Sequence, residues 1–277
     1  MSYELFISLR HLKAKRSQKF ISLNTWISVG GVALGVMALI VVIAVMSGFS
    51  KDLRDKILGT NSHVVVTNIT RTGMEDYEAV IEKVLKAQGV SAVAPFILNQ
   101  VMLTNGGTAV GVVVRGVDPA REAGVSDLEK NMVQGSLEML GGPKKSSGKS
   151  HRDGIILGKE LARRLGVQHD DVVSMVAPAS RVTPMGLIPK IKLFKVVGFF
   201  ESGMFEYDSN LAFISIYSAQ KFFAMKGKVS GIEIRVEDIG LADQVAAEIQ
   251  HSLGFPYYAR DWMQMNKNLF SALRLEK

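Results

Sequence analysis

The chain has 277 residues, a formal net charge of +7 and a hydrophobic fraction of 47%. This length is enough for one or two domains with a buried core. The sequence contains no cysteine, which excludes disulfides, thiolate metal sites and a cysteine nucleophile. Its positive charge fits either a nucleic-acid-binding protein or a basic collar beside anionic lipid headgroups, and the distribution of the charges decides between them.

Residues 1–19 are predicted to be a cytoplasmic amphipathic segment. Leu5, Leu9 and Leu12 recur at helical spacing, with Phe6 beside them, which indicates a short helix lying in the membrane interface. The only acidic residue of this segment is Glu4, and its basic residues are Arg10, Lys13, Lys15, Arg16 and Lys19.

Residues 20–50 are predicted to form a transmembrane helix. No charged residue lies between Lys19 and Lys51, and this stretch exceeds the roughly 20 apolar residues that cross a bilayer. The apolar core of a cleaved signal peptide is shorter, about 7–15 residues. Because basic residues resist translocation, we expect the N-terminus in the cytoplasm and the chain after residue 50 outside. Gly31 and Gly35 suit close helix packing, although glycine is also simply common in membrane helices.

Residues 51–265 are predicted to form an α+β domain on the extracytoplasmic side. Strands and helices intermix without the regular spacing of βαβ units, which favours α+β with two subdomains. Residues 51–58 continue the membrane helix, and short helical turns are expected between residues 121 and 140. Strands are predicted at 63–67, 109–117, 155–157, 172–176, 193–200, 211–216, 231–236 and 257–259, and helices at 76–87, 159–165, 219–224 and 242–253.

The segment 178–190 (PASRVTPMGLIPK) is predicted to be a loop between two strands. Its three prolines restrict the backbone, and Gly186 permits a turn at the tip. Four of its residues are nevertheless apolar, namely Val182, Met185, Leu187 and Ile188. Exposed apolar surface often marks a contact site. These residues alone leave open whether the loop is exposed or folds back onto the domain.

No pattern of catalytic residues is recognisable in the sequence. The five histidines are scattered without metal-ligand spacing, and no phosphate-binding loop of the GxxxxGK type occurs. The sequence therefore predicts a protein that is not an enzyme and that has no cofactor or metal. Its basic residues flank the membrane segment or lie in a solvated loop at residues 141–154, so no nucleic-acid partner is expected.

Several motifs nevertheless carry a resemblance to one family. They are Leu9-Arg10, GVMAL at 35–39, VMSGF at 45–49, GVDP at 116–119, GKELA at 158–162, and TPMGLIP at 183–189 followed by LFKVVG at 193–198. Together they resemble the permease subunits of the lipoprotein-releasing ABC transporter, the LolC/LolE family with its MacB-like periplasmic domain. The TPMG motif is the most specific, whereas GKELA is shared with permeases of the MacB type.

The resemblance implies a protein of the bacterial inner membrane with its main domain in the periplasm. A second permease subunit, in a homodimer or heterodimer, and separate cytoplasmic ATPase subunits would complete the transporter. Hydrolysis of ATP by those subunits would drive extraction of lipoproteins from the membrane lipid and their transfer to a periplasmic chaperone, LolA.

The resemblance also implies a role for particular residues. The segment 178–190, called the hook segment from here on, would bind the chaperone, with Met185, Leu187 and Ile188 entering its apolar cavity. Met46 and Phe49 would line the cavity into which lipoproteins pass. The hook residues that match the family motif are Arg181, Val182, Thr183, Pro184, Met185, Gly186, Leu187, Ile188 and Pro189.

Two features depart from the family pattern, and an alternative function stays open. Such a permease has four spans, whereas residues 266–277 resemble a helix leading toward a second span, so the chain looks truncated there. Residues 201–209 (ESGMFEYDS) resemble LolE and the hook segment resembles LolC, which suggests a hybrid type. The alternative function is a mechanotransmission permease subunit, like MacB or FtsX, without lipoprotein transfer; a membrane-anchored periplasmic enzyme fits less well.

Overall fold

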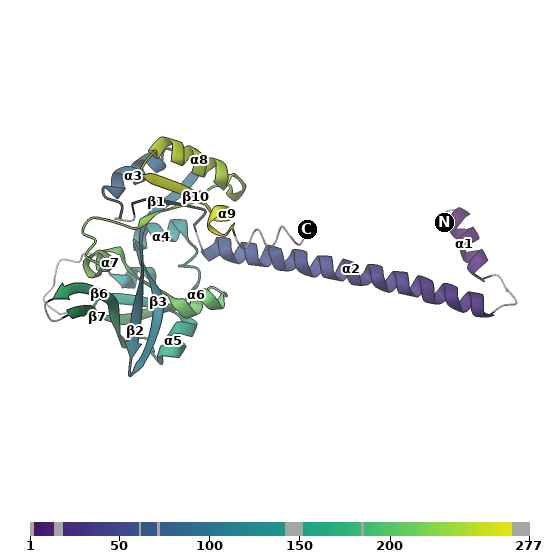
Figure 1. Cartoon of the computed structure of the whole chain (residues 1–277), viewed down its shortest axis with the longest axis horizontal. Coiled ribbons are helices and arrows are strands. Elements are labelled where there is room, and N and C mark those ends of the chain that lie inside the picture. Colours follow the sequence, from purple (N-terminus) through teal and green to yellow (C-terminus); the bar gives the residue numbers. More distant parts are fainter. Residues whose placement is uncertain are drawn as a thin grey trace. The chain divides into compact units, whose positions relative to one another are not determined.

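The computed structural model describes residues 3–13, 19–60, 62–70, 73–141, 152–183 and 186–267. The chain divides into two units, Met1–Arg54 and Asp55–Lys277, and each is described by itself (Figure 1). The predicted loop at 141–154 and the predicted helix at 266–277 lie largely outside the described residues.

The first unit consists of helix α1 (Tyr3–Lys13) and most of helix α2 (Lys19–Thr60). Within α2 the stretch Leu23–Phe49 is long and apolar enough to cross a membrane. Its apolar side chains are exposed on all sides of the helix, as Trp26 (67% exposed) and Val45 (63% exposed) illustrate. A helix that is apolar all round and unburied suits hydrocarbon surroundings. Residues 51–58 continue the same helix, as the sequence predicts.

The strands of the second unit belong to one sheet of ten strands within the described residues. Along the sheet the order is β10-β1-β9-β2-β3-β8-β5-β7-β4, and β6 pairs with both β2 and β7. The strands are β1 (Val64–Asn68), β2 (Val90–Asn105), β3 (Thr108–Val117), β4 (Met132–Gln134), β5 (Gly154–Gly158), β6 (Val172–Thr183), β7 (Gly186–Phe200), β8 (Leu211–Ser215), β9 (Gly231–Val236) and β10 (Tyr257–Asp261).

Strand β2 connects two parts of this sheet. On one side it pairs with β3, and on the other it pairs with β9 over residues 90–96 and with β6 over residues 102–104. Strands β2, β3, β8, β5, β7 and β6 therefore close into a ring, while β9, β1 and β10 extend the sheet beyond it. The two predicted subdomains share this sheet, so the outer domain is one compact unit.

The interior of the domain is filled by aliphatic and aromatic side chains that alternate along the strands. Leu103, Val173, Met175, Phe194 and Val196 are all fully buried, because every second side chain of a strand points to the same face. The same periodicity turns their neighbours outward, which gives the sheet a second face with its own chemistry.

Short helices cover the sheet, and α8 lies beside α3 over the β10 end (Figure 1). Helix α8 buries Ala242, Val245, Ala246 and Ile249, the spacing expected for one apolar helix face. The helices are α3 (Tyr77–Val84), α4 (Pro119–Val125), α5 (Lys159–Leu165), α6 (Phe205–Asn210), α7 (Ile216–Phe222), α8 (Ala242–Leu253) and α9 (Trp262–Met265), with short 3-10 turns η1 (Leu137–Leu140) and η2 (Ile239–Leu241).

The two ends of the outer domain meet on neighbouring strands. β1 and β10 are antiparallel, with Val64 opposite Asp261. The carbonyl of His63 accepts a hydrogen bond of 2.9 Å from the backbone N–H of Trp262. The segment that enters the domain from α2 is thus held beside the segment that leaves it.

Candidate functional site

The hook segment forms the end of a long hairpin made by β6 and β7. Pairing runs from Val172 opposite Lys195 to Thr183 opposite Gly186, with an interruption between Ala177 and Arg181. The sequence predicts a loop at 178–190, whereas the two strands continue through most of it. Two of its prolines, at 178 and 189, lie at the interruption, where no ladder hydrogen bond needs their missing N–H.

The predicted chaperone-binding residues are brought together at this end of the hairpin. Arg181, Val182 and Thr183 end β6, and the stretch from Gly186 to Pro189 begins β7. Pro184 and Met185 lie outside the described residues. Pro189 is exposed. The insertion of apolar hook side chains into a partner therefore stays a prediction.

An apolar surface that the sequence analysis missed lies at the base of the hairpin. Ile191 (61% exposed), Leu193 (46% exposed) and Met102 (44% exposed) belong to it. Val176 lies between Met102 and Ile191 in the register of three adjacent strands. The sequence signal for this surface was the alternation of side chains along β7. Because Phe194 is buried, its neighbour Leu193 and, two residues before, Ile191 point to the outer face.

The remaining predicted site residues lie on α2. Met46 and Phe49 are three residues apart and Gly31 and Gly35 are four apart, so each pair shares a face of the helix. Phe49 is 57% exposed. A Cβ added at either glycine would meet nothing within 4 Å, so this face is open for another helix.

Glycines in two of the family-like motifs allow close packing around the ring. A Cβ at Gly158, in GKELA, would lie 2.2 Å from the carbonyl oxygen of Asp208. A Cβ at Gly116, in GVDP, would lie 2.4 Å from the Cβ of Ala219. Both distances are far below van der Waals contact, so no residue with a Cβ fits at either position. The two glycines therefore allow α6 and α7 to approach the strands closely.

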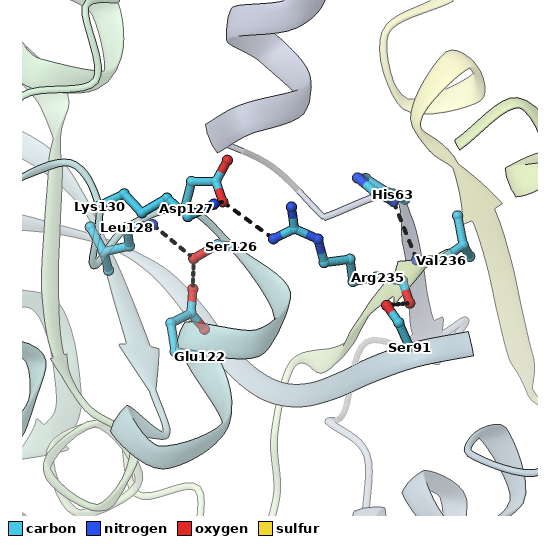
Figure 2. A network of polar contacts seen from close by, with 9 residues as sticks. All are labelled: His63, Ser91, Glu122, Ser126, Asp127, Leu128, Lys130, Arg235 and Val236. Atoms are coloured by element: carbon cyan, nitrogen blue, oxygen red, sulfur yellow. Dashed lines mark hydrogen bonds and ion pairs between the residues drawn. The ribbon is translucent and has the colours of Figure 1, made fainter. Parts of the chain in front are cut away.

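A polar network joins α4 to the strands near the start of the domain (Figure 2). Arg235 Nη1 donates to Asp127 Oδ1 at 3.3 Å. His63 Nδ1 accepts from the backbone N–H of Val236 at 3.2 Å. Burial, together with the nearby positive charge of Arg235, lowers the pKa of His63 below its ordinary value of 6.5.

A second charged cluster is buried between β3, β9 and α4. Arg115 forms an ion pair with Glu233 and lies 3.6 Å from a carboxylate oxygen of Glu122, which accepts from Ser126 Oγ at 2.7 Å. Arg115, Glu122 and Glu233 are each at most 7% exposed. This cluster was not predicted from the sequence, although a lone charge inside a β-branched run, as in VVVRGV, was a usable signal.

The described residues hold no group of three histidine, aspartate or glutamate side chains placed to bind a metal ion. The candidate sites described above are two surfaces, the hook hairpin and the faces of α2.

Residues 25–252 match the family model of the MacB-like periplasmic core domain. The chain belongs to this family. A crystal structure of the periplasmic region of MacB from Actinobacillus actinomycetemcomitans is 12% identical, with a TM-score of 0.47 over 77% of this chain and 97% of that one.

Full-length similarity to transmembrane proteins of the lipoprotein-releasing system accompanies the family match. LolC of Neisseria meningitidis is 35% identical over 277 residues, covering 100% of this chain and 65% of the relative. LolC of Xylella fastidiosa is 36% identical over 271 residues, covering 98% and 63%. LolE of Haemophilus influenzae is 22% identical, covering 99% and 65%. The chain thus spans a little less than two thirds of the length of these relatives.

Proposed function

We propose that this chain is the N-terminal part of a permease subunit of an ABC transporter that extracts lipoproteins from the bacterial inner membrane. The transporter passes the lipoproteins to a periplasmic chaperone. Similarity to LolC along the whole chain supports the assignment to this system. The observation that carries the transfer step is the hook segment, which contains the TPMG motif and in which Thr183 pairs with Gly186 at the end of the β6–β7 hairpin.

In this proposal the hook segment presents its apolar side chains to the chaperone. Met185, Leu187 and Ile188 enter the cavity in which the chaperone later carries the lipid. A hairpin suits this task, because paired strands hold the tip in position and lower the entropy lost on binding. The exposed apolar base around Ile191 would bury further surface in the same complex.

The membrane part of the proposal rests on α2. Its apolar stretch spans the inner membrane with the basic N-terminal segment in the cytoplasm. Met46 and Phe49 line the cavity that receives lipoproteins from the outer leaflet. Gly31 and Gly35 pack against another transmembrane helix, in this subunit or in the second permease subunit. The cytoplasmic ATPase subunits supply the energy.

The hook is tested by titrating the purified full chain in detergent with the periplasmic chaperone. Met185→Asp and Ile188→Asp each place a carboxylate where an apolar side chain is buried, so we expect Kd to rise by at least about tenfold, or about 1.4 kcal/mol. Ile69→Asp is the matched control, because Ile69 is exposed (56%) and belongs to neither strand of the hairpin. Unchanged binding in both hook variants would contradict the proposal.

The alternative function is that of a mechanotransmission subunit like MacB or FtsX. Membership of the family with a MacB-like periplasmic core domain is the observation that supports this alternative. Such a subunit needs no apolar hook. A folded chain that fails to bind the chaperone at any concentration tested would support this alternative. Relatives named LolC and LolE both match, which suits a hybrid type acting as a homodimer.

A further inference from the structure

Strand β2 is divided between the two parts of the sheet in the outer domain. Its residues 90–96 pair with β9, and its residues 96–105 pair with β3. We call β9, β1 and β10, with the helices α3 and α8 that cover them, the extension (Figure 1). In the registers of these two ladders the extension and the ring overlap on a single residue of their shared strand, Phe96.

The backbone beside Phe96 is held by a serine and not by a continuous strand. The carbonyl of Phe96 accepts from the backbone N–H of Ser230 at 2.8 Å, and the N–H of Leu98 donates to Ser230 Oγ at 3.0 Å. On the same edge of β2, pairing with β6 begins at Met102. Fewer ladder hydrogen bonds constrain β2 between these points, so this junction has the geometry of a hinge.

A buried ion pair crosses the junction. Arg115 lies on β3, opposite Leu98, and Glu233 lies on β9, opposite Ala94. The two side chains form an ion pair, and the guanidinium carbon of Arg115 lies 5.8 Å from the ring centroid of Phe96. Because β3 belongs to the ring and β9 to the extension, this pair links the two parts across the strand that they share.

Helix α4, which follows β3, adds two further links to the extension. Arg121 donates to both carboxylate oxygens of Glu78 in α3, at 3.1 and 3.0 Å. Asp127, just after the helix, accepts from Arg235 of β9 at 3.3 Å (Figure 2). All four side chains are partly exposed, and exposed ion pairs contribute little energy because water screens them.

The buried pair differs from these two in what it supplies. Arg115 and Glu233 are each at most 7% exposed. A buried ion pair adds little net stability, because the cost of taking two charges out of water offsets their attraction. Its separation, however, leaves buried charges without partners, whereas apolar contacts are not directional and tolerate small shifts. The pair therefore favours one relative position of the two strands that carry it.

We propose that the ion pair between Arg115 and Glu233 is a latch that fixes the angle between ring and extension, with Phe96 at the hinge. The chain enters and leaves the domain on β1 and β10, in the extension, whereas the hook segment ends the β6–β7 hairpin, in the ring. A closed latch passes a displacement of the entering or leaving segment to the hook segment as one rigid movement. This role, unlike the latch itself, rests on the proposed function.

The test measures the distance between two spin labels by pulsed electron paramagnetic resonance, in the full chain in detergent. Thr108→Cys, at the start of β3, and Ala247→Cys, in α8, place one label on each part at an exposed position, and the sequence contains no other cysteine. Glu233→Leu opens the latch, while Arg115 keeps a carboxylate of the ring side, Glu122, at 3.6 Å. We expect the distance distribution to widen by at least about twofold.

Glu201→Leu is the matched control, because it makes the same substitution in an ion pair within the ring. Its partner is Lys159, and the two residues follow strands β7 and β5. The width should stay that of the parent chain. If Glu233→Leu does not fold, Glu233→Gln removes the charge and nearly keeps the shape, and the distribution should again widen.

Two outcomes overturn the inference: an unchanged width in the folded Glu233 variant, or equal widening in Glu201→Leu. The measurement uses no chaperone, so its result is separable from that of the hook experiment. Chaperone binding by a chain whose distance distribution does not respond to Glu233 removes the latch alone. A distribution that responds, in a chain that does not bind the chaperone, establishes the latch and removes its role in transfer.

Discussion

His63 is a residue through which acid destabilises the outer domain. It is only 9% exposed, beside Arg235, and its Nδ1 accepts a backbone hydrogen bond that protonation of this atom would break. Its pKa is lowered in the folded chain, whereas in the unfolded chain it takes up a proton near pH 6.5. The unfolded state therefore binds more protons below that pH, and acidification favours unfolding.

We expect the free energy of unfolding to fall as the pH drops below about 6.5, with a contribution from His63 of up to about 1.4 kcal/mol per pH unit. The His63→Gln variant keeps an acceptor for the Val236 N–H but cannot be protonated, so its loss should be smaller. Denaturant unfolding followed by circular dichroism between pH 7.5 and pH 5.5 measures both. The same pH dependence in the two proteins would show that other groups are responsible.

Single residues were the hardest features to predict from the sequence. Arg115 and Glu233 are buried together although they are more than a hundred positions apart, and only the pairing of strands brings them into contact. The short motifs around Gly116 and Gly158 were recognisable, but their reason, contact with Ala219 and with Asp208, depends on tertiary structure.

At the scale of elements, regular periodicity was a reliable guide. The helices over 159–165 and 242–253 and the strand over 231–236 have the predicted bounds. Strand β2 was not predicted as such, because residues 93–97 are buried without alternation where α4 covers the other side. The strands in the hook segment were not predicted because prolines disfavour strand pairing. The interruption of the β6–β7 ladder accommodates these prolines.

The glycine face of α2 yields a prediction at the same scale. Replacing Gly31 and Gly35 together by leucine would keep two helices from close approach, so we expect self-association of the chain in lipid vesicles to weaken by about tenfold. Energy transfer between donor-labelled and acceptor-labelled copies measures it. Gly30→Leu, on a different face, is the control and should leave the transfer unchanged. Equal effects of both changes would exclude a specific glycine interface.

For the whole molecule, the proposed orientation can be tested directly because the sequence contains no cysteine. Ser8→Cys in α1 and Lys226→Cys in the outer domain are both at exposed positions. In intact cells with a permeable outer membrane, we expect a membrane-impermeant maleimide to label only Lys226→Cys. After the inner membrane is opened with detergent, both should react. Labelling of Ser8→Cys in intact cells would reverse the assigned orientation.

The adjacent ends of the outer domain have a consequence for its evolution and its use. Val64 and Asp261 face each other on neighbouring strands, so the chain enters and leaves the domain at nearly one point. A module with this geometry can be spliced into a loop between two helices without stretching the recipient chain. The domain is thus portable, and an unrelated protein with a short surface turn should accept it as an insertion.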